Sequence, residues 1–225
     1  ALPHLRDSML ADCAAVLPAG TTPKLVEAQN DSLSGLRLAL PDAPPTGDTH
    51  YRALRQRIAD APLSADTITH AHAILHALAA AEASVHGVAI ENVHFHELAD
   101  WDSLMDVVAA GSILGRCAGA TFSLSPLPLG SGTVKTQHGK MPVPTPATTI
   151  LLAGQTVFDD GVPGERVTPT GAAIVSVLPR GPMPLGTVAG QGFGAGTRTL
   201  PGIANVLRAL VIEPAAQPSF TGDSV

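Results

Sequence analysis

The side chains best suited to chemistry gather in one stretch near the middle of the chain. Imidazole and carboxylate groups are common ligands of transition metals. If residues 88–98 form a strand, His94 and His96 point to the same face, because alternate residues of a strand share a face. The pattern predicts a metal site, with a half-exposed polar strand and a helix cap at Asp102 as the alternative. Its five members are His94, His96, Glu97, Asp102 and Asp106.

Three further side chains could support or join this site: Glu82, His86 and His138. Glu82 and His86 are spaced i, i+4, so they face each other on a helix. A histidine in the last turn of a helix is also favoured by the helix dipole. A purely structural role for this pair therefore remains the alternative.

Glycine, hydroxyl and basic residues later in the chain predict a site for a polar or anionic ligand. Glycine lets the backbone approach a ligand closely, and a helix that begins after Thr168 would present N–H groups to an anion. A β-hairpin with glycine at its bends, and simple N-capping by Thr168 or Thr170, are the alternatives. The candidate ligand-binding residues are Gly130, Ser131, Gly132, Lys135, Thr168, Thr170 and Arg198.

The segment 190–195 formally matches G-x-G-x-x-A. A dinucleotide-binding fingerprint must follow a strand and open a helix. Residues 197–201 do not look like a helix start, so we reject this function and expect a loop that presents Arg198.

Hydrophobic periodicity and end signals place the elements that must position these residues. Ser64 is a suitable N-cap and Gly87 a suitable stop for a long helix between them. A helix over 102–114 is apolar on nearly all sides and should be buried. Shorter helices are expected after Pro146 and Thr168, and a last strand over 205–213. The prediction is an α+β fold, with a mixed sheet and an N-terminal helical region in a single domain.

Within this fold, three regions are expected. Residues 1–62 form a helical N-terminal extension with a linker near 41–48, residues 63–213 form the α+β core, and residues 214–225 form a flexible tail. The 225-residue chain has a net charge of −6 and no basic stripe, which excludes a nucleic-acid backbone as partner. It has no apolar run of the roughly 20 residues that a membrane span needs. Two unpatterned cysteines and the lack of a signal peptide favour the cytoplasm.

An ordered set of short motifs resembles the LarC family of nickel insertion proteins over roughly residues 50–213, its N-terminal and central portion. The motifs are Val-His-Gly at 85–87, Val-His-Phe-His-Glu at 93–97, Asp-Ser-Leu-Met-Asp at 102–106, Ser-Pro-Leu-Pro-Leu-Gly-Ser-Gly at 125–132, His-Gly at 138–139, Pro-Val-Pro-Thr-Pro-Ala at 142–147, Thr-Pro-Thr-Gly-Ala at 168–172, Gly-Phe-Gly-Ala-Gly-Thr-Arg at 192–198 and Asn-Val-Leu-Arg at 205–208.

This resemblance implies a metallochelatase (cyclometallase) of the lyase class that acts in lactate racemase maturation. Such an enzyme inserts nickel into a pyridinium-bisthiocarboxylate mononucleotide, makes nickel–carbon and nickel–sulfur bonds, and consumes CTP bound with a divalent metal. The histidine–carboxylate cluster would hold nickel, and the glycine, threonine and Arg198 segments would grip the mononucleotide. The CTP-binding C-terminal domain of the family has no counterpart here, so a partner domain or subunit is expected, and a homo-oligomer is a further expectation.

Two other functions remain open from the sequence. A non-catalytic nickel-binding chaperone or assembly subunit would carry the same ligands. A metal-dependent hydrolase would also place His-x-His after a strand, but it predicts a barrel, for which 225 residues is short.

Overall fold

The computed structural model describes residues 1–41, 43–44, 49–95, 101–136, 139–200 and 202–215. The helices are η1 (Pro3–Leu5), α1 (Arg6–Val16), α2 (Tyr51–Asp60), α3 (Ala65–His86), η2 (Ile90–Asn92), α4 (Trp101–Arg116), α5 (Pro146–Leu151) and α6 (Pro169–Val177). The strands are β1 (Lys24–Asn30), β2 (Leu33–Ala39), β3 (Leu127–Pro128), β4 (Gly130–Ser131), β5 (Thr133–Thr136), β6 (Gly139–Pro142), β7 (Val157–Phe158), β8 (Gly164–Glu165), β9 (Gly186–Ala195) and β10 (Val206–Pro214).

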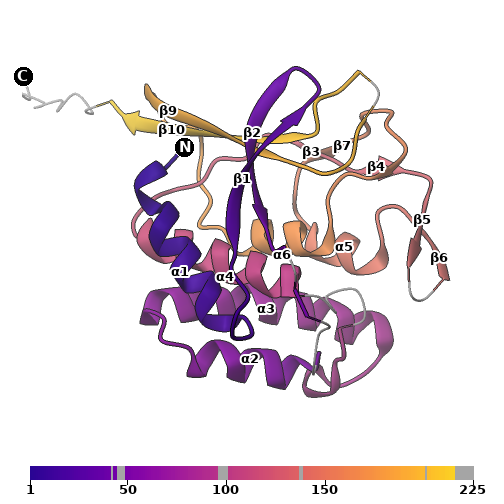
Figure 1. Ribbon diagram of the computed structural model, residues 1–225. Coiled ribbons are helices and arrows are strands. Elements are labelled where there is room, and N and C mark those ends of the chain that lie inside the picture. Colours follow the sequence, from indigo (N-terminus) through magenta and orange to yellow (C-terminus); the bar gives the residue numbers. More distant parts are fainter. Residues whose placement is uncertain (42, 45–48, 96–100, 137–138, 201, 216–225) are drawn as a thin grey trace, which may run out of the picture.

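A four-stranded mixed sheet in the order β1-β2-β9-β10 forms one layer of the fold. The pairs β1–β2 and β9–β10 are antiparallel, whereas β2 and β9 join in parallel where Leu36 pairs with Gly194. Gly35 permits this junction, because a Cβ atom there would lie 2.8 Å from the Phe193 carbonyl oxygen. The helices occupy the other layer (Figure 1). The predicted α+β fold in a single domain is confirmed.

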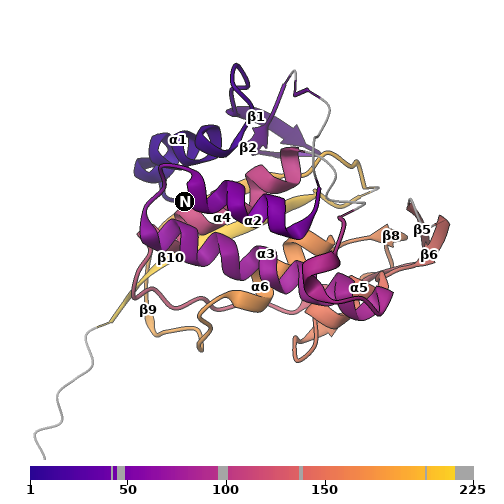
Figure 2. The ribbon, with the colours of Figure 1, turned by 90° about the horizontal axis from the view of Figure 1, so that it is seen from below.

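The helical layer is built around α3. Its ends match the predicted signals, since the Ser64 side chain accepts a hydrogen bond from the Thr67 N–H and Gly87 adopts a left-handed conformation with φ 64°. Helix α2 lies along α3 on the side away from the sheet (Figures 1 and 2). No helix in the described ranges is long and apolar enough to cross a membrane.

Helices α3 and α4 pack at very short range. A Cβ atom on Gly111 would lie 2.7 Å from the Ala71 backbone nitrogen, and one on Gly115 would lie 3.0 Å from the Thr67 nitrogen. Glycine is therefore the residue that lets the two backbones meet. The leucine, valine and alanine side chains beside this contact are fully buried and form the centre of the core.

A partly buried polar network, with Asp12 and Thr67 buried and Arg116 exposed, joins α1 to the same pair of helices. The Arg116 guanidinium lies 2.6 Å from the Asp12 carboxylate and donates to the Ser112 hydroxyl at 2.7 Å. The Thr67 hydroxyl completes the network, 3.4 Å from the same carboxylate. Because a buried charge is tolerated only when paired, this network fixes where α1 docks.

Three segments depart from the predicted secondary structure. Residues 24–39, inside the N-terminal region expected to be helical, form the β1–β2 hairpin. The strand predicted over 88–98 is wrong for its described part, which contains η2 and one isolated bridge at His94. The loop predicted over 190–195 is a strand within β9. Parts of the predicted linker (42 and 45–48) and most of the tail (216–225) lie outside the described residues.

Replacing Gly111 with alanine tests the α3–α4 contact. Helix propensity alone would favour alanine by about 1 kcal/mol, but overpacking against backbone atoms costs about 1–3 kcal/mol. The difference between the two predicts a net loss of up to about 2 kcal/mol in the free energy of unfolding, measured by denaturant titration. Gly194→Ala is the matched control, because a Cβ atom there meets no atom within 4 Å. Equal stability of the two variants would contradict the close contact.

Candidate functional site

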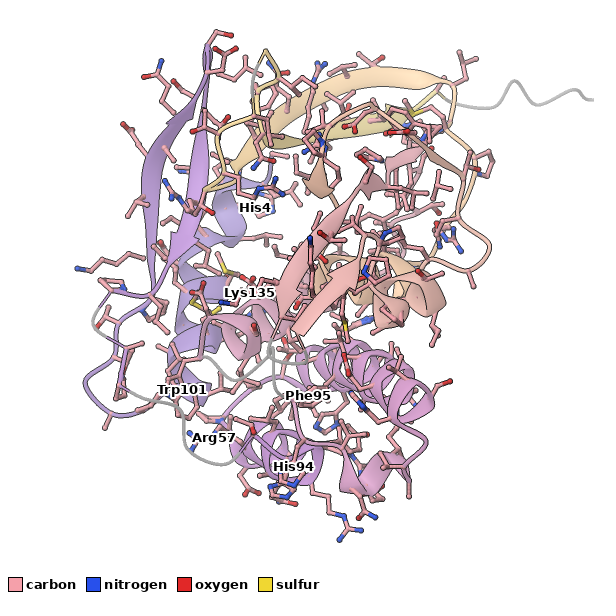
Figure 3. All side chains as sticks on the ribbon, turned by 90° about the vertical axis from the view of Figure 1, so that its right-hand side faces the viewer. His4, Arg57, His94, Phe95, Trp101 and Lys135 are labelled. Atoms are coloured by element: carbon pink, nitrogen blue, oxygen red, sulfur yellow. The ribbon has the colours of Figure 1, made fainter. Side chains whose placement is uncertain are left out.

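His94 occupies a short extended segment whose neighbours are fixed in the core. Val93 and Phe95 are each 2% exposed, whereas His94 between them is exposed, so the chain alternates inward and outward here. Two backbone hydrogen bonds hold the segment against the start of α2: the Tyr51 N–H donates to the Val93 carbonyl at 3.0 Å, and the Phe95 N–H donates to the Thr49 carbonyl at 3.1 Å. Figure 3 labels His94 and Phe95 on the helical layer.

The side chain beside His94 is His50, which the sequence reasoning did not include in the site. The two residues form an antiparallel β-bridge. Their ring centroids are 3.3 Å apart and the rings are tilted by 52°. The residues are 44 positions apart, so no local spacing pattern relates them.

Asp102 and Asp106 lie on the exposed side of α4, which is otherwise deeply buried. The start of this helix is anchored by Trp101, whose ring lies 4.8 Å from the Arg57 guanidinium. Among the described residues, no three histidine, cysteine, aspartate or glutamate side chains gather where they could hold a metal ion. His94, Asp102 and Asp106 are therefore not brought into one such group. His96 and Glu97 lie outside the described residues.

Cys13 lies beneath α4 and is not suited to bind a metal ion. Its thiol is fully buried and donates to the Met105 carbonyl at 3.7 Å. Burial, followed by the negative charges of Asp106 and Asp12, raises the pKa of Cys13 to about 12. Because the thiolate is the form that binds metals and reacts with electrophiles, Cys13 is inert at neutral pH.

Glu82 and His86 form the predicted pair on the last turn of α3. The imidazole Nε2 of His86 lies 3.3 Å from the Glu82 carboxylate, and both side chains are partly exposed. This contact and the C-cap at Gly87 provide the structural role that the sequence also allowed. His138 lies outside the described residues.

Three of the predicted ligand-binding residues, Gly130, Ser131 and Arg198, meet at strand β8. Gly130 pairs with Glu165 and Ser131 with Gly164. The Arg198 guanidinium donates to the backbone carbonyls of Glu165 and Pro163. Glycine is required at Gly164, where φ is +90° and a Cβ atom would lie 2.6 Å from an Arg198 nitrogen.

Asn30, at the end of β1, fixes the backbone of Arg198. Its amide donates to the Arg198 carbonyl at 3.0 Å and to the Gly196 carbonyl at 3.2 Å. Its amide oxygen accepts from the Asn205 N–H at 2.8 Å. Asn30 is buried, so these bonds replace lost hydration and hold the arginine in place. A lone asparagine at this position gave no signal of this role in the sequence.

The other predicted ligand residues lie where the alternatives placed them. The Thr168 hydroxyl accepts from the Gly171 N–H at 3.2 Å and caps α6, whose first turn contains Thr170. Lys135 is on the β5–β6 hairpin directly opposite Lys140. This hairpin projects at one edge of the molecule (Figures 1 and 2), and Lys135 is labelled in Figure 3. Gly132 precedes the hairpin with φ +80°.

Comparison with known proteins decides the family. A family model described as nickel insertion protein matches residues 6–224. The chain belongs to the nickel insertion protein family. The resemblance found in the sequence is thereby confirmed, and the family involves nickel. The hydrolase alternative has no barrel in the described residues, whose largest sheet has four strands.

Curated relatives in the nickel insertion family align with about three quarters of this chain. The chain is 46% identical over 171 residues to one from Pelobacter propionicus and 47% identical over 161 residues to one from Geobacter sulfurreducens, both named as nickel insertion proteins. It is 42% identical over 166 residues to a protein of Geobacillus kaustophilus, named pyridinium-3,5-bisthiocarboxylic acid mononucleotide nickel insertion protein. These alignments cover 75%, 71% and 73% of this chain and 44%, 42% and 40% of the relatives. The chain therefore spans less than half the length of the relatives, and no solved structure matches it.

The two cysteines of this family member should differ in reactivity. At neutral pH we expect a thiol-alkylating reagent to modify partly exposed Cys117 and to leave Cys13 unmodified, because the Cys13 thiol is buried and protonated. Mass spectrometry of the two peptides measures the extent of reaction. In denaturant both should react at similar rates. Equal rates in the folded protein would contradict the placement of Cys13.

Proposed function

We propose that this chain holds nickel(II) as a substrate and delivers it to a pyridinium-3,5-bisthiocarboxylic acid mononucleotide. The observation that carries the proposal is membership of the nickel insertion family, together with a relative named for that insertion that is 42% identical over 73% of this chain. The reaction belongs to the biosynthesis of a cofactor.

The proposed nickel ligands are the histidine–carboxylate cluster, with Glu82, His86 and His138 as supporting groups. Nickel(II) stands high in the Irving–Williams order and accepts imidazole and oxygen ligands. His94 supports the proposal, because it is exposed while both of its neighbours are locked in the core. Asp102 and Asp106 present exposed carboxylates on a rigid helix. The cluster is completed by His96 and Glu97.

The proposed mononucleotide site combines the β5–β6 hairpin with the region around β4 and β8. Two lysines directly opposite each other on a hairpin repel, and a bound phosphate would relieve that repulsion between Lys135 and Lys140. Arg198 is held in place by backbone carbonyls and retains further N–H donors for a carboxylate or phosphate. Gly130–Gly132 and the helix start at Thr168–Thr170 would supply backbone N–H groups.

The chemistry proposed for the full enzyme balances without a redox step. Nickel(II) gains two bonds from the thiocarboxylate sulfurs and one from a ring carbon, and that carbon loses its proton to a base. We propose that CTP, bound with a divalent metal on a C-terminal domain or subunit, is consumed in this lyase-class reaction. Arg198 and the lysines would orient the mononucleotide, and the histidines would deliver the metal.

A second function also fits the exposed His94, Asp102 and Asp106 side chains. A nickel-binding chaperone or assembly subunit would use the same ligands but need the rest of the machinery from a partner. Nickel insertion by this chain alone would favour the enzyme. Insertion only after a separate C-terminal part of a relative is added would favour the chaperone or assembly subunit.

Nickel insertion itself is the first test. The purified chain would be incubated with nickel(II), the mononucleotide, CTP and Mg²⁺, with and without the C-terminal part of the Geobacillus relative. Mass spectrometry would detect nickel in the mononucleotide. We expect His94→Ala to reduce nickel incorporation by about tenfold or more, since even supporting groups at metal sites contribute 10–100-fold. His70→Ala on α3 is the control. Equal incorporation by the two variants would remove the proposed site, and no incorporation with or without the added part would remove the proposed activity.

The lysine pair should affect binding of the mononucleotide rather than of nickel. We expect Lys135→Ala or Lys140→Ala to weaken mononucleotide binding about fivefold at low salt, since an exposed ionic contact contributes about 1 kcal/mol. The effect should shrink as salt rises, because exposed charges are screened. Calorimetric titration measures both, with Lys24→Ala as a control for net charge. Equal affinity of all three variants would exclude the hairpin from the site.

A further inference from the structure

We propose that His50 and His94 together form a two-imidazole site that holds nickel(II) before its transfer. The inference rests on the proposed function, because that function makes nickel the substrate. It adds His50 to the proposed cluster as a direct ligand beside His94.

The backbone places these two side chains as close as cross-strand neighbours can be. The bonds from Tyr51 to Val93 and from Phe95 to Thr49 flank the His50–His94 pair, so the two histidines exchange no backbone hydrogen bond with each other. In an antiparallel ladder, such non-hydrogen-bonded pairs have the shortest Cα separation and their side chains share one face. The register of this antiparallel bridge therefore places the two imidazoles next to each other.

The two segments that carry the pair are held firmly on both sides. Val93, Phe95 and Tyr51 are buried, and the Tyr51 hydroxyl is 3.2 Å from the Nδ1 of His76. On the surface, the Arg52 guanidinium lies 2.9 Å from the Glu91 carboxylate and links α2 to η2. A metal site gains affinity when its ligands are preorganised, and these contacts provide that rigidity.

The ring geometry fits a metal-ready pair. Metal–nitrogen bonds of about 2.0–2.1 Å place the centres of two adjacent imidazoles on one ion on the order of 4–5 Å apart. The observed 3.3 Å is roughly 1 Å or more shorter, so the rings are in direct contact and one side chain must rotate to admit an ion between ring nitrogens. His94 is exposed and His50 half-buried, which gives the ion a path from solvent.

A site with exchangeable coordination positions suits a metal ion that must be transferred. Sites that only hold a metal surround it with four protein ligands, whereas sites that use it keep positions open. Nickel(II) favours square-planar or tetragonal surroundings. With His50 and His94 bound, the other positions carry water or the remaining groups of the proposed cluster, which incoming thiocarboxylate sulfurs can displace. The imidazole and water ligands are released chemically unchanged, so the transfer needs no oxidant or reductant.

Nickel(II) binding to the purified chain tests the pair. Affinity would be measured by calorimetry and by competition with a coloured chelator for the wild type, His50→Ala, His94→Ala, the double variant and the control His70→Ala. We expect each single variant at the pair to lose about tenfold or more in affinity. Because both residues serve one ion, the double variant should lose far less than the product of the two single losses. His70→Ala should bind like the wild type.

A nickel-edge X-ray absorption spectrum of the wild-type complex gives a second readout that needs no variant. We expect at least two imidazoles per nickel, and one fewer in His50→Ala. If His50→Ala binds as tightly as His70→Ala, or the wild type shows fewer than two imidazoles, His50 is not a ligand and the contact is a stacked ring pair. Loss of affinity in His94→Ala alone, with insertion retained by His50→Ala, would overturn this inference and leave the proposed function standing. Nickel binding unaffected by both single variants would remove both.

Discussion

The fold depends on the close contact between α3 and α4. Gly111 and Gly115 bring the α4 backbone against Ala71 and Thr67, and the largest group of fully buried side chains packs around that crossing. The crossing fixes the direction of both helices. The far end of α3 leads through Gly87 into the His94 segment, and the start of α4 carries Asp102. The segments that carry the proposed nickel ligands thus continue from two helices whose spacing requires glycine at the contact.

The two candidate regions have different supports. The histidine pair is tied to the helical layer through Val93, Phe95 and Tyr51, whereas Arg198 is tied to the sheet through Asn30. Each region keeps its polar groups exposed while buried neighbours hold the backbone still. Under the proposed function, nickel and an anionic nucleotide would bind at these separate regions, so one region could adapt to its ligand without disturbing the other.

Local signals explain what the sequence could predict. Ser64 and Gly87 mark the ends of α3 because their side-chain oxygen and left-handed backbone act within a few residues. The same holds for Pro146 and Thr168 at the starts of α5 and α6. These elements and the α+β class followed from periodicity and end signals. The family followed from the order of the motifs, which needs no geometry.

Pairing between distant segments explains what the sequence could not predict. The alternation around His94 suggested a strand, yet one isolated bridge forms among the described residues, because its partner, residues 49–51, leads directly into α2. Nothing near His94 in the sequence identifies His50 as its neighbour. The β1–β2 hairpin was missed because β2 is stabilised by β9, more than 150 residues later. The placements of His96, Glu97 and His138 remain predictions.

The junction between β2 and β9 also has a consequence for how the chain folds. Leu36 pairs with Gly194, and most of the sequence lies between them. Closing so large a loop costs conformational entropy before the strand contact can stabilise the fold. Sheets dominated by such non-local contacts form slowly. The helical layer, whose α3–α4 contact closes a much shorter loop, can assemble first and offer a surface on which the two hairpins dock. During synthesis, β1 and β2 must therefore wait, with a strand edge unpaired, until β9 has left the ribosome.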